Sequence, residues 1–85
     1  MKHAGNAALD ALNDLLADLR RLDGLTEKKR GIFYRKSSAF LHFHEDPAGL
    51  FADLRVGDDF RRCAVNTRAE RRALLAQVAA LLAQP

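Results

Sequence analysis

The chain has 85 residues, of which 48% are hydrophobic, and its 14 basic and 11 acidic side chains leave a formal charge of +3. This length predicts a single domain, residues 1–85, built around one hydrophobic core. The one cysteine, Cys63, excludes an intrachain disulfide and a cysteine-based zinc site, and the small charge excess permits an anionic partner without requiring one.

The N-terminal stretch lacks the continuous apolar run of a signal peptide, because Asp10 and Asp14 interrupt it. No other run approaches the roughly 20 apolar residues that a membrane span needs. With a single cysteine and no such segment, we expect a soluble protein of a reducing, cytoplasmic compartment that does not contact a membrane.

The first predicted element is one helix from Asn6 to Leu22, with Asn6 as its N-cap and Gly24 as its stop signal. Its apolar face is formed by leucines at helical spacing, namely Leu9, Leu12, Leu16 and Leu19, with Leu15 and Leu22 beside them. The opposite face is acidic and carries Asp10, Asp14 and Asp18. The segment that follows, LTEKKRG at 25–31, is expected to be a polar connector.

From residue 31 the hydrophobic period changes to two, which is typical of strands. We expect four strands, at 31–36, 39–45, 50–56 and 60–65. The turns between them, at 37–38, 46–49 and 57–58, are too short to join anything but antiparallel neighbours. The pattern therefore predicts a four-stranded antiparallel meander.

The last element is a helix that begins at Thr67. Thr67 and Glu70, three residues apart, match a capping box. A buried stripe follows, made of Leu74, Leu75, Val78, Leu81 and Leu82. The predicted fold class is therefore α+β: helix, four-stranded meander, helix, with both helices packed on one face of the sheet and the other face open.

The alternation along the strands sorts their residues between these two faces. The helix-covered set is predicted to be Ile32, Tyr34, Ala39, Leu41, Phe43, Leu50, Ala52, Leu54, Val56, Cys63 and Val65. The open face, which we take as the candidate binding face, is predicted to carry Phe33, Arg35, Phe40, His42, His44, Phe51, Asp53, Arg55, Phe60 and Arg62.

The three turns also predict a register. One row across the open face then reads Phe33, His42, Asp53 and Arg62, and the next reads Arg35, Phe40, Arg55 and Phe60. His44 would lie opposite Phe51. Because a carboxylate beside an imidazole favours the charged form, we expect Asp53 to raise the pKa of His42 above its ordinary value.

Several functions fit this face. His42 and His44, with Asp53 as a third ligand, form a candidate zinc site, and His42 oriented by Asp53 is part of a catalytic triad. No nucleophile completes that triad, since Cys63 is expected to point into the core. A metal-dependent or histidine-based enzyme is therefore one alternative. Weak nucleic-acid binding is another, because exposed phenylalanines stack bases and arginines bind phosphate.

The preferred hypothesis is a non-enzymatic binding or interaction module, without a cofactor or bound metal. Four phenylalanines interleaved with Arg, His and Asp would form a large apolar patch for so small a chain. Such a composition suits the core of an interface. The expected partner is a second copy of the chain, another protein or a small ligand.

The block FYRKSSAFLHFHEDPAGLFADLR, residues 33–55, resembles short uncharacterised bacterial α/β domains. It is distantly similar to the luciferase-like domain, in which a strand bearing His-x-His is followed by a turn and an Asp-Leu strand. The matching positions are His42, His44, Asp53 and Leu54. The resemblance covers about a third of the chain and implies the fold rather than an activity, and the early C-terminal helix departs from it.

Overall fold

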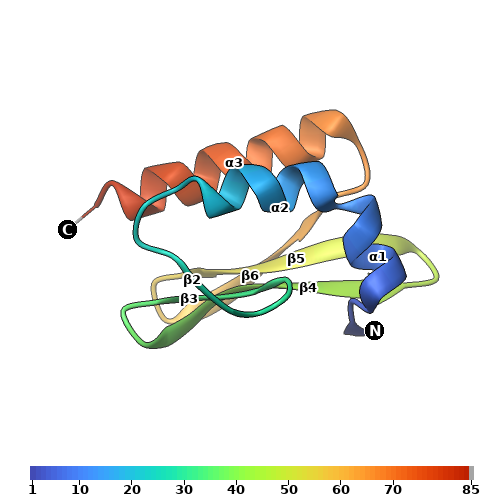
Figure 1. Ribbon diagram of the computed structural model, residues 1–85, viewed down its shortest axis with the longest axis horizontal. Coiled ribbons are helices and arrows are strands. Elements are labelled where there is room, and N and C mark those ends of the chain that lie inside the picture. The colour runs from blue at the N-terminus through green and yellow to red at the C-terminus, as the bar shows by residue number, and fades with distance from the viewer. Residues whose placement is uncertain (85) are drawn as a thin grey trace.

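The computed structural model describes residues 1–84, and over these residues the protein is an α+β fold with a six-stranded antiparallel sheet and three helices (Figure 1). The helices are α1 (Asn6–Ala11), α2 (Asn13–Arg20) and α3 (Arg68–Leu82). The strands are β1 (Lys2–His3), β2 (Thr26–Lys29), β3 (Ile32–Arg35), β4 (Ser38–Asp46), β5 (Gly49–Val56) and β6 (Asp59–Ala64). Within this part of the chain, no helix combines the length and the apolar character needed to cross a membrane.

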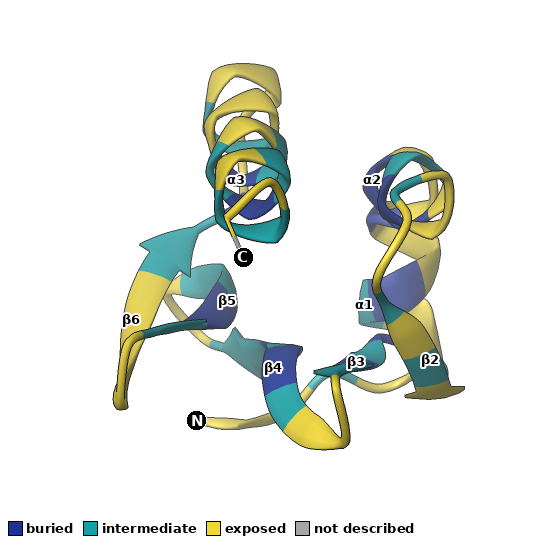
Figure 2. Ribbon diagram, turned by 90° about the vertical axis from the view of Figure 1, so that its left-hand side faces the viewer, coloured by how far each residue is buried: buried dark blue, intermediate teal, exposed yellow. Residues whose placement is uncertain are grey.

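The sheet has the strand order β2-β3-β4-β5-β6, and β1 pairs with β4 where β3 has ended. In Figure 2 the strands follow an arc, and α2 and α3 lie on its concave side. We call the side that faces the helices the inner face. The opposite side, which carries His42, His44 and Asp53, is called the outer face.

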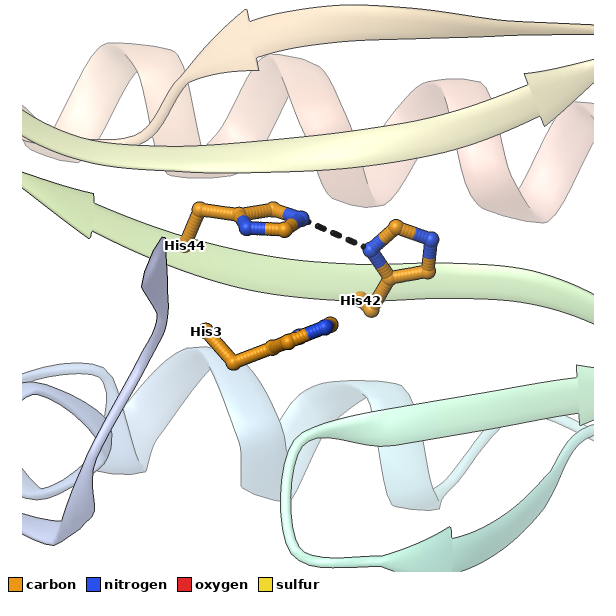
Figure 3. Close-up of side chains that lie close together, drawn as sticks. All are labelled: His3, His42 and His44. Carbon is orange, nitrogen blue, oxygen red and sulfur yellow. Dashed lines mark hydrogen bonds between the residues drawn. The ribbon is translucent and has the colours of Figure 1, made fainter. Parts of the chain in front are cut away.

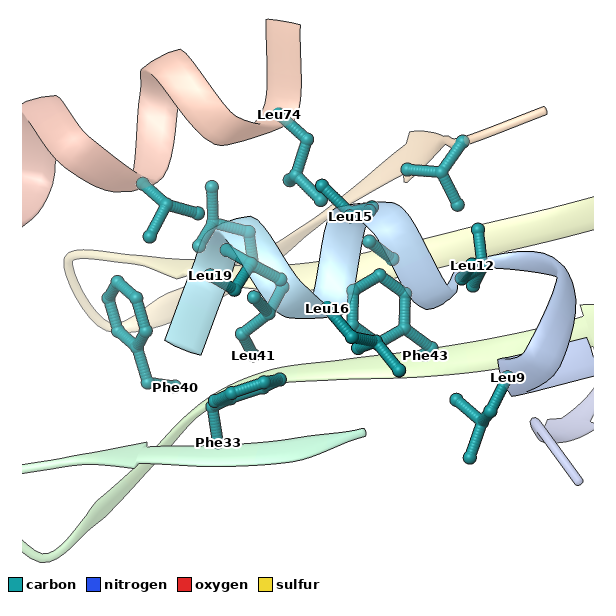
Figure 4. Close-up of a cluster of buried hydrophobic side chains, with 14 residues drawn as sticks. Leu9, Leu12, Leu15, Leu16, Leu19, Phe33, Phe40, Leu41, Phe43 and Leu74 are labelled. Carbon is teal, nitrogen blue, oxygen red and sulfur yellow. The ribbon is translucent and has the colours of Figure 1, made fainter. Parts of the chain in front are cut away.

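The core lies between the inner face and the helices (Figure 4). Its largest fully buried side chains come from the helices, the strands β3, β4 and β5, and the residues that follow α1 and β6. They are Leu12, Leu16, Leu19, Phe33, Leu41, Phe43, Leu54, Val65, Leu74 and Val78. Burial of these side chains is the main favourable contribution to folding, at about 25 cal/mol per Å² of apolar surface. It holds β4 and β5, the strands that carry His42, His44 and Asp53, against the helices.

The predicted first helix is interrupted. Leu12 leaves helical geometry, with φ −102° and ψ 12°, and it separates α1 from α2. The N-cap is Gly5 rather than Asn6. The break allows Leu9 to pack so closely on Gly31 that a Cβ there would lie 2.6 Å from its methyl group. Helical periodicity continues across the break, and for this reason the sequence pattern does not reveal it.

The region predicted to be a connector contains a strand. β2 pairs with β3 along the edge of the sheet, and β1 adds a further short pairing with β4. Both strands are polar and largely exposed. An edge strand needs only main-chain hydrogen bonds on one side, so it is stable without an apolar alternation.

The predicted register between β3 and β4 is wrong. The turn is formed by Lys36 and Ser37, both with positive φ, so that Arg35 lies opposite Ser38. The register then shifts between the Phe33 and Tyr34 pairings, leaving Phe40 as an additional residue in β4. Beyond that bulge Ile32, and not Phe33, lies opposite His42.

The bulge moves three residues from the predicted open face. Phe33 and Phe40 are buried in the core, with 1% and 4% of their surface exposed. Arg35 points toward the helices, where its Nη2 donates to the carbonyl oxygen of Gln84 at 2.8 Å. Conversely, Ile32 and Tyr34, predicted as core residues, lie on the outer face and are half-buried.

The predictions for the rest of the sheet are confirmed. His42 lies opposite Asp53, which in turn lies opposite Arg62. His44 pairs with Phe51, and the turn at 57–58 places Arg55 opposite Phe60. The capping box of α3 is also present, since Thr67 Oγ1 accepts from the Glu70 N–H at 3.1 Å and Glu70 Oε1 accepts from the Thr67 N–H at 3.0 Å.

Candidate metal centre

The three histidines of the chain meet on the outer face of the sheet (Figure 3). His42 and His44 are alternate residues of β4, so they project from the same side of the strand. His3 comes from β1, directly opposite His44. One ring nitrogen from each histidine lies within 4.8 Å of the other two. Three potential metal ligands therefore converge from positions 3, 42 and 44.

The contacts among the three rings are close. His42 Nδ1 and His44 Nε2 are 2.9 Å apart, which is hydrogen-bonding distance. The His3 ring stacks on the His44 ring, with centroids 4.7 Å apart and an angle of 28° between the planes. His3 is exposed, whereas His42 and His44 are half-buried. The cluster is thus ordered on its β4 side and open to solvent at β1.

A buried carboxylate adjoins the cluster. Only 8% of Asp53 is exposed, and its Oδ2 lies 3.1 Å from His44 Nε2. Arg62 binds both oxygens of this carboxylate, with Nε donating to Oδ1 at 2.9 Å and Nη2 donating to Oδ2 at 3.0 Å. The hydrogen-bonded guanidinium lowers the pKa of Asp53, so the imidazoles face an ionised carboxylate at neutral pH.

The prediction that the pKa of His42 lies above its ordinary value is wrong. The pKa of His42 is lowered, mainly by burial and then by the nearby His44, and the opposing attraction of Asp53 is weaker. The reason is that Asp53 makes its close contact with His44 and shares its charge with Arg62. His42 is therefore a neutral imidazole at neutral pH, which is the form that ligates metal ions.

The spacing of these atoms requires a shared proton or a metal ion. Two ring nitrogens at 2.9 Å cannot both direct lone pairs at each other unless a proton or a metal ion lies between them. The carboxylate of Asp53, when ionised, accepts hydrogen bonds only. A proton on His44 Nε2 satisfies both neighbours, and a metal ion ligated by the same atoms would take its place.

The remaining residues of the predicted binding face surround this cluster. Phe60 is 41% exposed, and its ring centroid lies 5.0 Å from that of His42. The guanidinium of Arg55 lies over the Phe60 ring, 4.7 Å from the ring centroid, and its Nε donates to the carbonyl oxygen of Ala39. Phe51 is half-buried. Seven of the predicted residues therefore share the outer face: His42, His44, Phe51, Asp53, Arg55, Phe60 and Arg62.

Sequence reasoning missed His3, because a two-residue strand has no periodicity by which to recognise it. The available signal was its residue type, since the chain contains only three histidines. Sequence alone could not pair β1 with the far end of β4.

The cluster belongs to the outer face, which is the convex side of the curved sheet (Figure 2). A cleft of about 680 Å³ lies elsewhere, between α2 and α3. Its two walls have opposite charges, with Asp14 and Asp18 facing Arg68 and Arg72.

No protein-family model matches this chain, and no curated protein or solved structure matches it either. The resemblance to the luciferase-like domain is therefore untested.

Proposed function

We propose that the protein binds a divalent transition-metal ion of the zinc type through His3, His42 and His44. The observation that carries the proposal is the convergence of every histidine of the chain on one point of the outer face. Imidazole nitrogens bind zinc at about 2.0–2.1 Å, so the ligands of a tetrahedral site are spaced by about 3.4 Å. The nitrogens of the cluster lie within 4.8 Å of one another, so small side-chain rotations would bring them to that spacing.

This proposal changes the order of the hypotheses drawn from the sequence. A contact surface had the strongest support there because of its four phenylalanines, but two of these, Phe33 and Phe40, are buried in the core. Nucleic-acid binding also loses support, because Arg35 donates to Gln84 and Arg62 is paired with Asp53. The zinc hypothesis gains His3 as an additional ligand.

An interaction surface is retained as a second candidate, because one observation favours it. Phe60 is one of two large hydrophobic residues in the described part of the chain that are exposed, the other being Met1. Arg55 covers one side of its ring. Phenylalanine and arginine are enriched in interface cores, so this pair suits contact with a second copy or another protein. Sedimentation of wild type and Phe60→Ser over a concentration series tests it, and an unchanged monomer for both would reject the homodimer.

Calorimetric titration of untagged protein with Zn²⁺ tests the metal proposal. We expect one ion per chain, and a loss of affinity of about 100-fold or more in His3→Ala and in His42→Ala, because each removes a ligand. The matched control is Lys2→Ala, which changes the same short strand without removing a ligand. If His3→Ala binds zinc as tightly as Lys2→Ala does, the proposed site is wrong.

A further inference from the structure

We infer that Asp53 is the fourth ligand of the bound ion, so that three imidazoles and one carboxylate form a closed site that fastens β1 to the centre of the sheet. This inference rests on the proposed function, because it concerns the same ion. It goes further because it assigns the ion a structural role. It also leaves no coordination position of the ion open to water or substrate.

The first argument is the spacing around His44. Its Nε2 lies 2.9 Å from His42 Nδ1 and 3.1 Å from Asp53 Oδ2. Ligands that share a tetrahedral zinc ion are about 3.4 Å apart. A single nitrogen therefore has two neighbours near the separation expected of ligands on one ion, and one of these neighbours is the carboxylate. Asp53 lies outside the group of mutually close ligand atoms that the three histidines form, so a four-ligand site requires histidine side chains to rotate toward the carboxylate.

The second argument is the way in which Asp53 is held. Arg62 binds both of its oxygens and fixes the plane of the carboxylate, while Oδ2 is also directed toward His44. Ligating carboxylates are commonly hydrogen-bonded in this way by a neighbouring residue, which orients them. Asp53 is also buried, with 8% of its surface exposed, so neighbouring atoms restrict its side chain. Arg62 is thus a positioning residue for the proposed ligand.

The third argument is topological. The four ligands come from three strands, β1, β4 and β5, and span residues 3 to 53. β1 is otherwise held at the surface, by a hydrogen bond from the Ala4 N–H to the Phe43 carbonyl and by contacts of Lys2 and Gly5 with Glu45. A chain of this size without a disulfide gains from a cross-link of this kind. Four protein ligands are typical of structural zinc sites, whereas catalytic sites keep one position for water.

The cobalt-substituted protein distinguishes a closed site from an open one, because Co²⁺ in a zinc site absorbs visible light according to its coordination. We expect the wild-type spectrum to be unchanged by azide, since no ligand position is free. Asp53→Asn exchanges the carboxylate for a weak ligand of the same shape, so azide should bind to its cobalt and shift the bands. If azide shifts the wild-type spectrum, the site is open and the inference is wrong, while the proposed metal binding stands.

Failure of the proposed function has a different signature, namely no cobalt bands in the wild type, or unchanged bands in His3→Ala. The azide response of the wild type decides the inference even if Asp53→Asn does not fold. Hydrogen exchange provides a second measurement. Zinc should slow exchange of the Ala4 amide, which bonds to Phe43, and this protection should be absent in His3→Ala. Equal exchange of that amide with and without zinc would contradict the fastening role.

Discussion

The two faces of β4 differ sharply although their residues alternate along one strand. Leu41 and Phe43 point to the inner face and are buried, with 0% and 2% of their surface exposed. His42 and His44 point to the outer face, where they meet His3. Core residues and candidate metal ligands therefore alternate along β4 and lie on opposite faces of the same sheet. It follows that either can be changed while the other is kept.

The largest expected effect comes from a pair of neighbouring substitutions. Phe43→Ala should lower the free energy of unfolding by about 3–5 kcal/mol, because it leaves a cavity in the core. His42→Ala should change it by about 1 kcal/mol or less in metal-free protein, because that side chain is half-buried on the outer face. Urea unfolding in the presence of a chelator measures both. Similar losses for the two variants would contradict the separation of the faces.

The outer face is ordered by polar contacts in place of apolar packing. Among residues 1–84, every buried side-chain nitrogen or oxygen atom has a hydrogen-bond partner. The buried carboxylate of Asp53 illustrates this, since Arg62 satisfies both of its oxygens. A buried polar group without such a partner would destabilise the fold. The histidine cluster is therefore positioned by a network that the inner face does not supply.

A substitution at the start of α3 separates the stability of the fold from the properties of the histidine cluster. Thr67→Ala removes the side-chain cap of α3 and should lower the free energy of unfolding by about 1 kcal/mol. Zinc affinity should remain that of the wild type at temperatures where both proteins are folded, because α3 contributes no residue to the cluster. Thermal unfolding and calorimetric titration check the two parts. A parallel loss of zinc affinity would show that the site responds to global stability and not to its own ligands.

The sequence predicts the strands β4, β5 and β6 and their register because alternation, short turns and face polarity agree there. The sequence fails to predict the pairing of β3 with β4. A single bulged residue of β4, Phe40, shifts the register there, so that the side chains of β3 lie on the face opposite to the predicted one. Alternation cannot detect an additional residue in a strand, and Phe33 and Phe40 are as apolar as the core requires. The pair formed by Asp53 and Arg62 was predictable from the register, and it is confirmed.

The sequence could not predict the contact between His3 and the two histidines of β4, because these residues are far apart in the chain. His3 reaches the cluster by pairing with a strand about 40 residues away, and β1 has no pattern of its own. The pKa of His42 was predicted in the wrong direction for a related reason. The register of the strands shows which residues lie opposite one another. It does not show how deeply His42 is buried, or that Asp53 contacts His44 rather than His42, because both depend on side-chain packing.

The smallest expected effect concerns the rim between the helices and the sheet, where Arg20 of α2 binds Glu27 of β2. Arg20 Nε donates to Glu27 Oε1 at 2.6 Å, and the Gly31 N–H donates to Oε2 at 2.9 Å. These contacts, led by the hydrogen bond from Arg20, lower the pKa of Glu27 from its ordinary value of 4.5. A carboxylate whose folded-state pKa is lowered stabilises the fold above its unfolded pKa, and this contribution is lost as the pH falls through the folded-state value.

Glu27→Gln should therefore be less stable than the wild type by about 0.5–1 kcal/mol at neutral pH, since the pair lies at the surface. The difference should begin to shrink as the pH falls below 4.5 and should vanish as the pH falls through the lower folded-state pKa, where the wild-type carboxyl becomes neutral. Urea unfolding of both proteins between neutral and acidic pH measures it. A difference that stays constant down to acidic pH would mean that Glu27 contributes through packing and not through its charge. A difference as large as that expected for Phe43→Ala would mean that the rim, and not the inner face alone, holds the helices on the sheet.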